Sequence, residues 1–182
     1  MVDGRPLFLD LEADSYFLLD ANAEADFLDD PGAFAIEAKP PIPVQSILDL
    51  AETQSAPAIW DILMVANMVC RVRTDVNRQP LARLVGDLAQ SAAGGEARQD
   101  DAYLLAGRFA RARRWIPIEP HCLHDSLALL FFLRRYCSHA TLVFGAKRHP
   151  FAAHCWVQRG TMLLNDRLDS IASFTPVHNV GR

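Results

Sequence analysis

The chain has 182 residues, of which 51% are hydrophobic and 22% charged, and its formal net charge is −4. Such a composition is that of a soluble globular protein, with enough length for one moderate domain or two small ones. No apolar run is long enough to span a bilayer, and the N-terminus carries acids where a signal peptide would carry bases. We therefore expect a cytoplasmic protein without direct membrane insertion.

The charges are divided unevenly along the chain. Residues 1–56 hold 12 acidic and 2 basic side chains, a net of −10, whereas residues 57–182 hold 10 acidic and 16 basic, a net of +6. This division favours two domains, 1–56 and 57–182; a single domain whose front strands merely cover the core is the alternative. The acidic front part argues against nucleic acid as a partner and favours a basic or neutral one.

The four cysteines stand at positions 70, 122, 137 and 155, without a CxxC pair and without the Cys/His spacing of a structural zinc site. We therefore expect reduced thiols and no metal. The run Gly145-Ala146-Lys147 is not a phosphate loop, because Ala140 stands where such a loop needs a glycine. The sequence accordingly predicts no cofactor.

The front part begins with two short apolar runs, 7–11 and 15–19, which a polar turn separates. They predict a β-hairpin. A helix near 21–28 and a strand at 33–38 are expected next, and residues 46–53 predict a short helix beyond a proline-rich stretch.

Three helices are predicted between the front part and the first candidate site residue. They cover 59–72, 81–90 and a stretch that Asp100-Asp101 caps and that ends near Trp115, with a flexible loop at 91–95. Acids at the start of the third helix and arginines near its end are what a helix dipole favours. Those arginines form either a solvated face or a surface for an acidic partner.

Residues 121–135 predict a further helix, because they are almost entirely apolar from 123 to 133 and follow Pro120, which suits a helix entry. Cys122 then falls in the first turn. Free amides and the positive end of the helix dipole lower a thiol's pKa there. Cys122 is therefore a candidate nucleophile, and the alternative is an ordinary small buried cysteine.

The candidate base is His154, in a strand-like run at 152–158 that ends near Gly160. A second run at 162–166 is expected to return antiparallel to it. His154 would face Asp166 across a three-residue loop or a bulge, whereas a two-residue turn would put them on opposite faces. A thiol at a helix N-terminus, a strand imidazole and a carboxylate that holds it are the arrangement of a thiol hydrolase.

Two histidines, His121 and His124, lie closer to Cys122 along the chain than His154 does. A base must approach the sulfur from a separate rigid element, so His154 is preferred over both.

Asp169 is the rival for the carboxylate position. Asp166 is preferred because it is expected to end a strand, whereas Asp169 is expected in a loop. Trp156 should lie on the same face as His154, where it either walls the site or packs in the core.

Three stretches of the second part carry a resemblance to a known family: CLHDSLALLFFLRRY at 122–136, VFGAKRHPFAAHCW at 143–156 and LLND at 163–166. They resemble the leader peptidases of lasso-peptide biosynthesis, often called B proteins, which are distant relatives of transglutaminase-like and papain-like thiol enzymes. The resemblance covers roughly residues 100–180.

The resemblance implies a Cys-His-Asp triad, which maps onto Cys122, His154 and Asp166 of this chain. Two positions depart from the family pattern. Asp125 stands where a basic residue is common, and Cys155 stands between His and Trp where alanine is usual.

The order of elements in residues 1–56 resembles a winged-helix-like domain that binds a leader peptide by adding it as a strand to a sheet edge. The implied fold class is thus α+β. A small N-terminal leader-recognition domain (1–56) is followed by a transglutaminase-like/papain-like cysteine protease domain (57–182) of helices and an antiparallel sheet.

The implied function is a cysteine protease that cleaves the leader peptide from a ribosomally synthesised lasso-peptide precursor. The expected partners are this precursor and an asparagine-synthetase-like lasso cyclase, which receives the freed core amine. Two alternatives stay open: a thiol acyltransferase of the transglutaminase type, and a non-catalytic peptide-binding scaffold.

Overall fold

The computed structural model describes residues 7–10, 15–18, 40–50, 56–90 and 99–181. The strands are β1 (Leu7–Asp10), β2 (Ser15–Leu18), β3 (Gln45–Ser46), β4 (Thr141–Arg148), β5 (Phe151–Arg159), β6 (Met162–Leu163) and β7 (Thr175–Val180). The helices are α2 (Ile47–Leu50), α3 (Ile59–Val76), α4 (Leu81–Gln90), α5 (Gln99–Arg113), α6 (Cys122–Arg135) and α7 (Leu168–Ile171). The predicted α+β class is confirmed.

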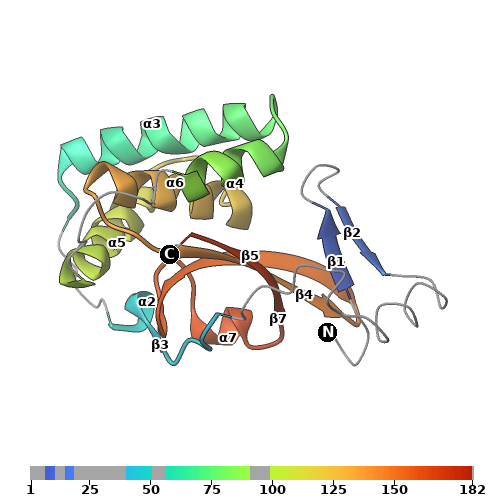
Figure 1. Ribbon diagram of the computed structural model, residues 1–182. Helices are drawn as coiled ribbons and strands as arrows, with labels where there is room; N and C mark the ends of the chain where they lie inside the picture. The colour runs from blue at the N-terminus through green and yellow to red at the C-terminus, as the bar shows by residue number, and fades with distance from the viewer. Residues whose placement is uncertain (1–6, 11–14, 19–39, 51–55, 91–98, 182) are drawn as a thin grey trace.

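The main sheet has the strand order β3-β6-β5-β4-β7. All neighbours in it are antiparallel except β3 and β6, which are parallel, so the expected antiparallel sheet holds apart from one edge. The β4 and β5 strands form a long hairpin at its centre (Figure 1). Separately, β1 and β2 pair antiparallel, as the hairpin prediction required.

The helices α3, α4, α5 and α6 cover one face of the main sheet, whereas α7 lies on the other (Figure 1). Successive residues of a strand point to opposite faces, so β4 supplies both cores. Leu142 and Phe144 pack against the helices, and Val143 packs with Trp156 and Ile171 on the α7 side. Because β4 is buried on both faces, its sequence is a continuous apolar run rather than an alternating one.

Most elements of the second part lie where the sequence predicts them. The α4 helix has the predicted bounds, α3 begins at the predicted residue and runs four residues further, and β5 is longer than expected. The β6 strand is shorter than predicted and ends at Leu163. The structure adds α7, β3 and β7, which were not predicted.

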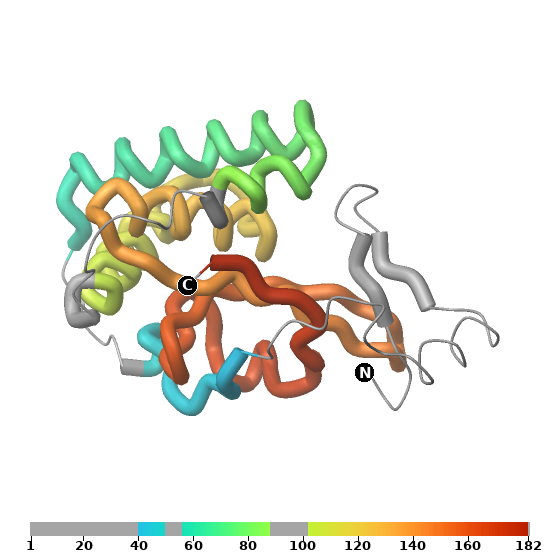
Figure 2. Tube along the Cα trace, viewed as in Figure 1, coloured from blue at the N-terminus to red at the C-terminus, as the bar shows by residue number. Residues whose placement is uncertain are grey.

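The predicted elements at 21–28 and 33–38, and the loop at 91–95, lie outside the described residues, as does most of the predicted winged-helix-like domain. The boundary between 56 and 57 therefore stays a prediction. One observation bears on the segment before it: Gln45 and Ser46 pair with Met162 and Leu163. Figure 2 shows this segment beside the C-terminal strands, although 120 residues separate Ser46 from Asp166.

Within the described residues, no helix combines the length and the apolar character that crossing a membrane requires.

Candidate active site

Cys122 lies in the first turn of α6, as predicted, where it is the first helical residue, and it is exposed. His121 precedes it with an extended backbone and makes no side-chain capping hydrogen bond. The amides of a first helical turn have no partner within the helix, so they and the helix dipole favour negative charge at this end. A thiolate and an oxyanion of a bound substrate are groups that such a helix end stabilises.

Arg113 fixes the approach to this helix. Its Nε donates to Asp125 Oδ1 at 2.8 Å, and its two terminal nitrogens donate to the carbonyls of Ile116 and Ile118 at 3.2 and 2.9 Å. The segment that leads to Cys122 is thereby tied to both α5 and α6. Asp125, where a basic residue is common in the resembling family, has this arginine as its partner.

The edge of β5 beyond β6 provides the other side of the site. Because β6 ends at Leu163, the chain bends away from β5 after this residue. The Asn165 side chain then takes the place of a strand partner, since the Val157 amide donates to Asn165 Oδ1 at 2.8 Å. Asn165 Nδ2 in turn donates to Ser126 Oγ on α6, also at 2.8 Å. Ser126 Oγ donates to the Cys155 carbonyl at 3.4 Å. This edge is therefore occupied by a bend and a helix instead of a strand.

His154 and Asp166 lie in contact, but the loop that joins their two chain segments differs from the predicted one. The strands are joined by the two-residue loop Gly160-Thr161, with Gly160 at φ +57° and Gln158 opposite Leu163, and not by a three-residue loop or a bulge. A continued ladder would have placed the two side chains on opposite faces. The bend after β6 instead brings Asp166 Oδ2 to 2.5 Å from His154 Nε2.

Asp166 was preferred over Asp169 because it was expected to end a strand. This prediction is wrong, since Asp166 lies in the bend after β6. Asp169 lies on α7 and is exposed. Of the two carboxylates, Asp166 is the one that contacts His154.

Asp166 is held from several directions. Its backbone carbonyl accepts a hydrogen bond from Ser46 Oγ at 2.5 Å, and its Oδ1 accepts one from the Arg167 amide at 2.7 Å. Burial favours the neutral acid, but hydrogen bonds from His154, the Arg167 amide and Ser170 outweigh it and lower the pKa of Asp166. The side chain is therefore a carboxylate at neutral pH.

His154 bonds to Cys122 as well as to Asp166. Since Asp166 occupies Nε2, the nitrogen that faces the sulfur is Nδ1. The hydrogen bond to Asp166, followed by the one to Cys122, raises the pKa of His154 to about 9, against the effect of burial. The structure thus brings the three predicted side chains into contact in the order thiol, imidazole, carboxylate.

The pKa of Cys122 is lowered to about 4. The hydrogen bond from the Cys155 thiol is the largest cause, followed by the one from His154; burial opposes them, and the Cys155 backbone contributes further. With the His154 pKa near 9, the pair is a thiolate and an imidazolium at neutral pH. Such an ion pair is a nucleophile already activated before a substrate arrives.

Aromatic rings wall the imidazole. The ring of Phe174 lies 5.2 Å from that of His154, and Lys147 Nζ lies 5.0 Å from the Phe174 ring. Trp156 is on the same face as His154, as predicted, at 6.3 Å between ring centroids. It is also a core residue, so both interpretations of Trp156 hold. Gly145 permits this packing, because a Cβ there would lie 2.5 Å from the Trp156 ring.

The two nearer histidines contact each other and lie outside this series. The rings of His121 and His124 are edge to face at 5.2 Å. Burial is the main cause that lowers the pKa of His124, followed by the charges of His121 and Arg73. His124 Nδ1 is buried without a hydrogen-bond partner.

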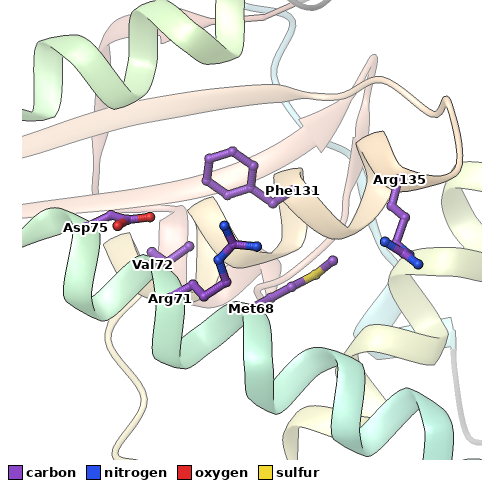
Figure 3. A pocket seen from close by; sticks show the side chains of 6 residues that line it. All are labelled: Met68, Arg71, Val72, Asp75, Phe131 and Arg135. Atoms are coloured by element: carbon purple, nitrogen blue, oxygen red, sulfur yellow. The ribbon is translucent and has the colours of Figure 1, made fainter.

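A separate hollow of about 320 Å³ lies between α3 and α6 (Figure 3). Its lining residues are Met68, Arg71, Val72, Asp75, Phe131 and Arg135. None of these belongs to the thiol site. Across the part of the chain that the structure describes, no three or more His, Cys, Asp or Glu side chains gather in a way that could hold a metal ion.

The fold and the site define a class: an α+β protein whose helix-terminal thiol faces an imidazole on a strand. The sequence match agrees with this class, since residues 64–179 match the transglutaminase-like superfamily. The chain belongs to this family. No curated protein and no solved structure matches it significantly.

Proposed function

We propose that the protein is a cysteine protease that removes the leader peptide from a ribosomally synthesised lasso-peptide precursor. The observation that carries the chemical part is the series Cys122, His154 and Asp166, whose side chains come from a helix, a strand and a bend. The substrate part rests on the resemblance of 122–136 and 143–156 to lasso leader peptidases.

In the proposed reaction, the Cys122 thiolate attacks the carbonyl carbon at the junction of leader and core. The tetrahedral oxyanion is stabilised at the N-terminus of α6, with the Cys122 amide as one donor. The imidazolium of His154 gives its proton to the leaving amine of the core, and the C–N bond breaks. A thioester with the leader is left on Cys122.

Water then resolves the thioester. His154, now neutral, takes a proton from the attacking water, and Asp166 stabilises the imidazolium that forms. The leader departs as a carboxylic acid, and the thiolate and imidazolium are restored. The core peptide, with its free amine, passes to an asparagine-synthetase-like lasso cyclase as the proposed partner.

Residues 1–56 are proposed to bind the leader peptide, with the acidic character of this part selecting a basic or neutral segment. A test of this division must spare Ser46, because its hydroxyl holds Asp166. Removal of residues 1–39 should weaken precursor binding much more than it slows cleavage of a short junction peptide. Equal losses in both would show that the two parts do not act separately.

The main experiment uses a lasso-peptide precursor, with leader and core joined, as the substrate. The wild type should release the leader and the core, whereas Cys122→Ala should bind the precursor and leave it intact. Cys70→Ala is the matched control, because Cys70 is an exposed thiol on α3, a helix that carries none of the three site residues. Cleavage by Cys122→Ala at the wild-type rate would overturn the proposal and favour a non-catalytic scaffold.

The same assay separates hydrolysis from acyl transfer, which the transglutaminase-like family also supports. With an added primary amine, a protease yields the leader as its free acid, and an acyltransferase yields the leader amide. Mass spectrometry of the leader fragment distinguishes them. A predominant amide would replace the protease by the acyltransferase.

A further inference from the structure

Cys155 is a buried thiol that favours the Cys122 thiolate but forms and breaks no bond in the proposed hydrolysis. It follows His154 on β5, only 3% of its surface is exposed, and its side chain points to the helical face, where Sγ lies 3.9 Å from Ser126 Oγ. Ser126 is one helical turn after Cys122 on α6, so both residues lie on the face of α6 that meets β5.

Cys155 and Cys122 contact each other twice. The thiol of Cys155 is hydrogen-bonded to the sulfur of Cys122, and the Cys155 backbone is bonded to the same sulfur. The second contact follows from the early end of β6, which leaves this part of the β5 edge without a partner strand. Two thiols thus meet at the site, one exposed and one buried.

We propose that Cys122 and Cys155 form a peroxide-responsive thiol pair, in which a hydroperoxide oxidises Cys122 and Cys155 then closes a disulfide on it. The pair requires neither a peptide substrate nor a lasso partner. It depends only on the nucleophilic sulfur of Cys122 and on the contact with Cys155.

In the first step, the Cys122 thiolate attacks a peroxide oxygen, so that an S–O bond forms and the O–O bond breaks. The imidazolium of His154 protonates the leaving oxygen, which departs as an alcohol or, from hydrogen peroxide, as water. The sulfur loses two electrons to the peroxide and becomes a sulfenic acid. In the second step, the Cys155 sulfur attacks the Cys122 sulfur, and the hydroxyl leaves as water with the proton of the Cys155 thiol.

The charge of Cys122 controls when Cys155 can react. The hydrogen bond to Cys122 is the largest cause that raises the pKa of Cys155, followed by burial and by the Cys122 charge. Cys155 is therefore a neutral thiol while Cys122 is a thiolate. Oxidation of Cys122 to the neutral sulfenic acid removes the two causes that depend on its charge, and Cys155 becomes more acidic at the moment when it must attack.

The consequence for the protein is reversible protection. A low-pKa, exposed thiolate is prone to further oxidation to the sulfinic acid, which thiol reductants do not reverse. A disulfide with Cys155 stops at the reversible stage and blocks the nucleophile meanwhile. Alanine at this position would leave Cys122 without this partner.

The test uses the full chain with Cys70→Ser and Cys137→Ser, so that Cys122 and Cys155 are the two remaining cysteines. After treatment with hydrogen peroxide, the intact mass should fall by two hydrogen atoms and neither thiol should react with iodoacetamide after denaturation. Trypsin should yield peptides 115–134 and 149–159 as one disulfide-linked species. Dithiothreitol should restore both thiols.

Adding Cys155→Ala to the same background should change the product. Cys122 should then gain oxygen atoms, react with dimedone and pass to a sulfinic acid that dithiothreitol does not reduce. The proposal is overturned if the parent with Cys155 gains oxygen at Cys122 without the linked peptides. This result does not depend on how the alanine variant folds, and neither result depends on cleavage of any peptide.

Discussion

Cys122 reaches the site on the first turn of α6, whereas His154 and Asp166 reach it at the edge of β5 beyond the end of β6. The helix that carries the nucleophile is fixed by residues that are close in sequence, through the Arg113–Asp125 ion pair, whose partners are 12 residues apart. The base side relies on hydrogen bonds between distant residues, such as Ser46 with Asp166.

The two sides of the site control different properties. The helix end and the Cys155 thiol favour the thiolate whatever the state of the imidazole, whereas the orientation and charge of His154 depend on Asp166. Changes at the base side should therefore reduce turnover strongly and thiol reactivity only in part. Each of the following predictions tests that separation.

The largest effect is expected for His154→Ala. Loss of the base should lower kcat/KM for precursor cleavage by about 10³-fold or more. Cys122 should still react with iodoacetamide, but the pH midpoint of this reaction should rise from about 4, because one of the three hydrogen bonds that favour the thiolate is lost. His121→Ala is the control, since this nearby imidazole lies outside the series. A comparable loss of turnover in His121→Ala would instead identify His121 as the base.

Asp166→Asn is expected to have the next largest effect. The amide cannot stabilise the imidazolium, so the pKa of His154 should fall from about 9 towards its ordinary value of 6.5, and kcat/KM should fall by about 10²-fold. An NMR titration of the His154 ring measures the first change. Asp169→Asn removes the same charge from the exposed α7 helix and should leave both quantities within about twofold. An unchanged His154 titration in Asp166→Asn would contradict the assignment.

The elements that the sequence predicts well are those whose signals are local. The apolar run of α6 and the proline before it are sufficient to place Cys122 in the first turn, and the apolar content of β4 and β5 is sufficient to place His154 on a strand. The β7 strand lacks such a signal, because Thr175–Val180 contains polar residues and Pro176 and becomes a strand by pairing with β4.

The route by which Asp166 meets His154 follows from contacts that no local pattern contains. Asn165 replaces a ladder partner of Val157 and bonds to Ser126, which is 39 residues away, and this pair of bonds makes the bend favourable. The pattern of LLND predicts a continuing strand, because Leu163 and Leu164 are both apolar. Which residue ends the ladder is decided by tertiary hydrogen bonds.

Asn165→Ala tests whether the bend depends on the hydrogen bonds of Asn165, and it should lower activity less than Asp166→Asn does. Loss of the side chain leaves the Val157 amide and the Ser126 hydroxyl without these partners, which should cost about 2–3 kcal/mol of unfolding free energy. Asp166 should be held less firmly, so kcat/KM should fall by about tenfold. Urea unfolding gives the first quantity, with Asn67→Ala on the exposed face of α3 as control. A stable Asn165→Ala protein with wild-type activity would show that the bend forms without this side chain.

The last prediction concerns the pH dependence that the thiolate itself adds to the free energy of unfolding. Between pH 4 and 6.5, the folded Cys122 is a thiolate while the unfolded thiol, with an ordinary pKa of 9.0, keeps its proton. The unfolded state therefore binds more protons, and the free energy of unfolding rises with pH. From 6.5 to about 9 the folded His154 keeps a proton that the unfolded imidazole loses, which offsets the rise and levels the curve.

Cys122→Ala removes the contribution of Cys122, which makes the free energy of unfolding rise with pH. It leaves the contribution of His154, which makes this free energy fall with pH, because Asp166 still favours the imidazolium. The variant should accordingly lose stability relative to its own maximum above pH 6.5, where the wild type is level. Subtracting the two urea-unfolding curves cancels the titration of the surface carboxylates, and the difference should increase from pH 4 into the neutral range. A difference that is constant over this range would mean that Cys122 is protonated in the folded protein. The nucleophile side would then lack the pre-formed charge that distinguishes it from the base side.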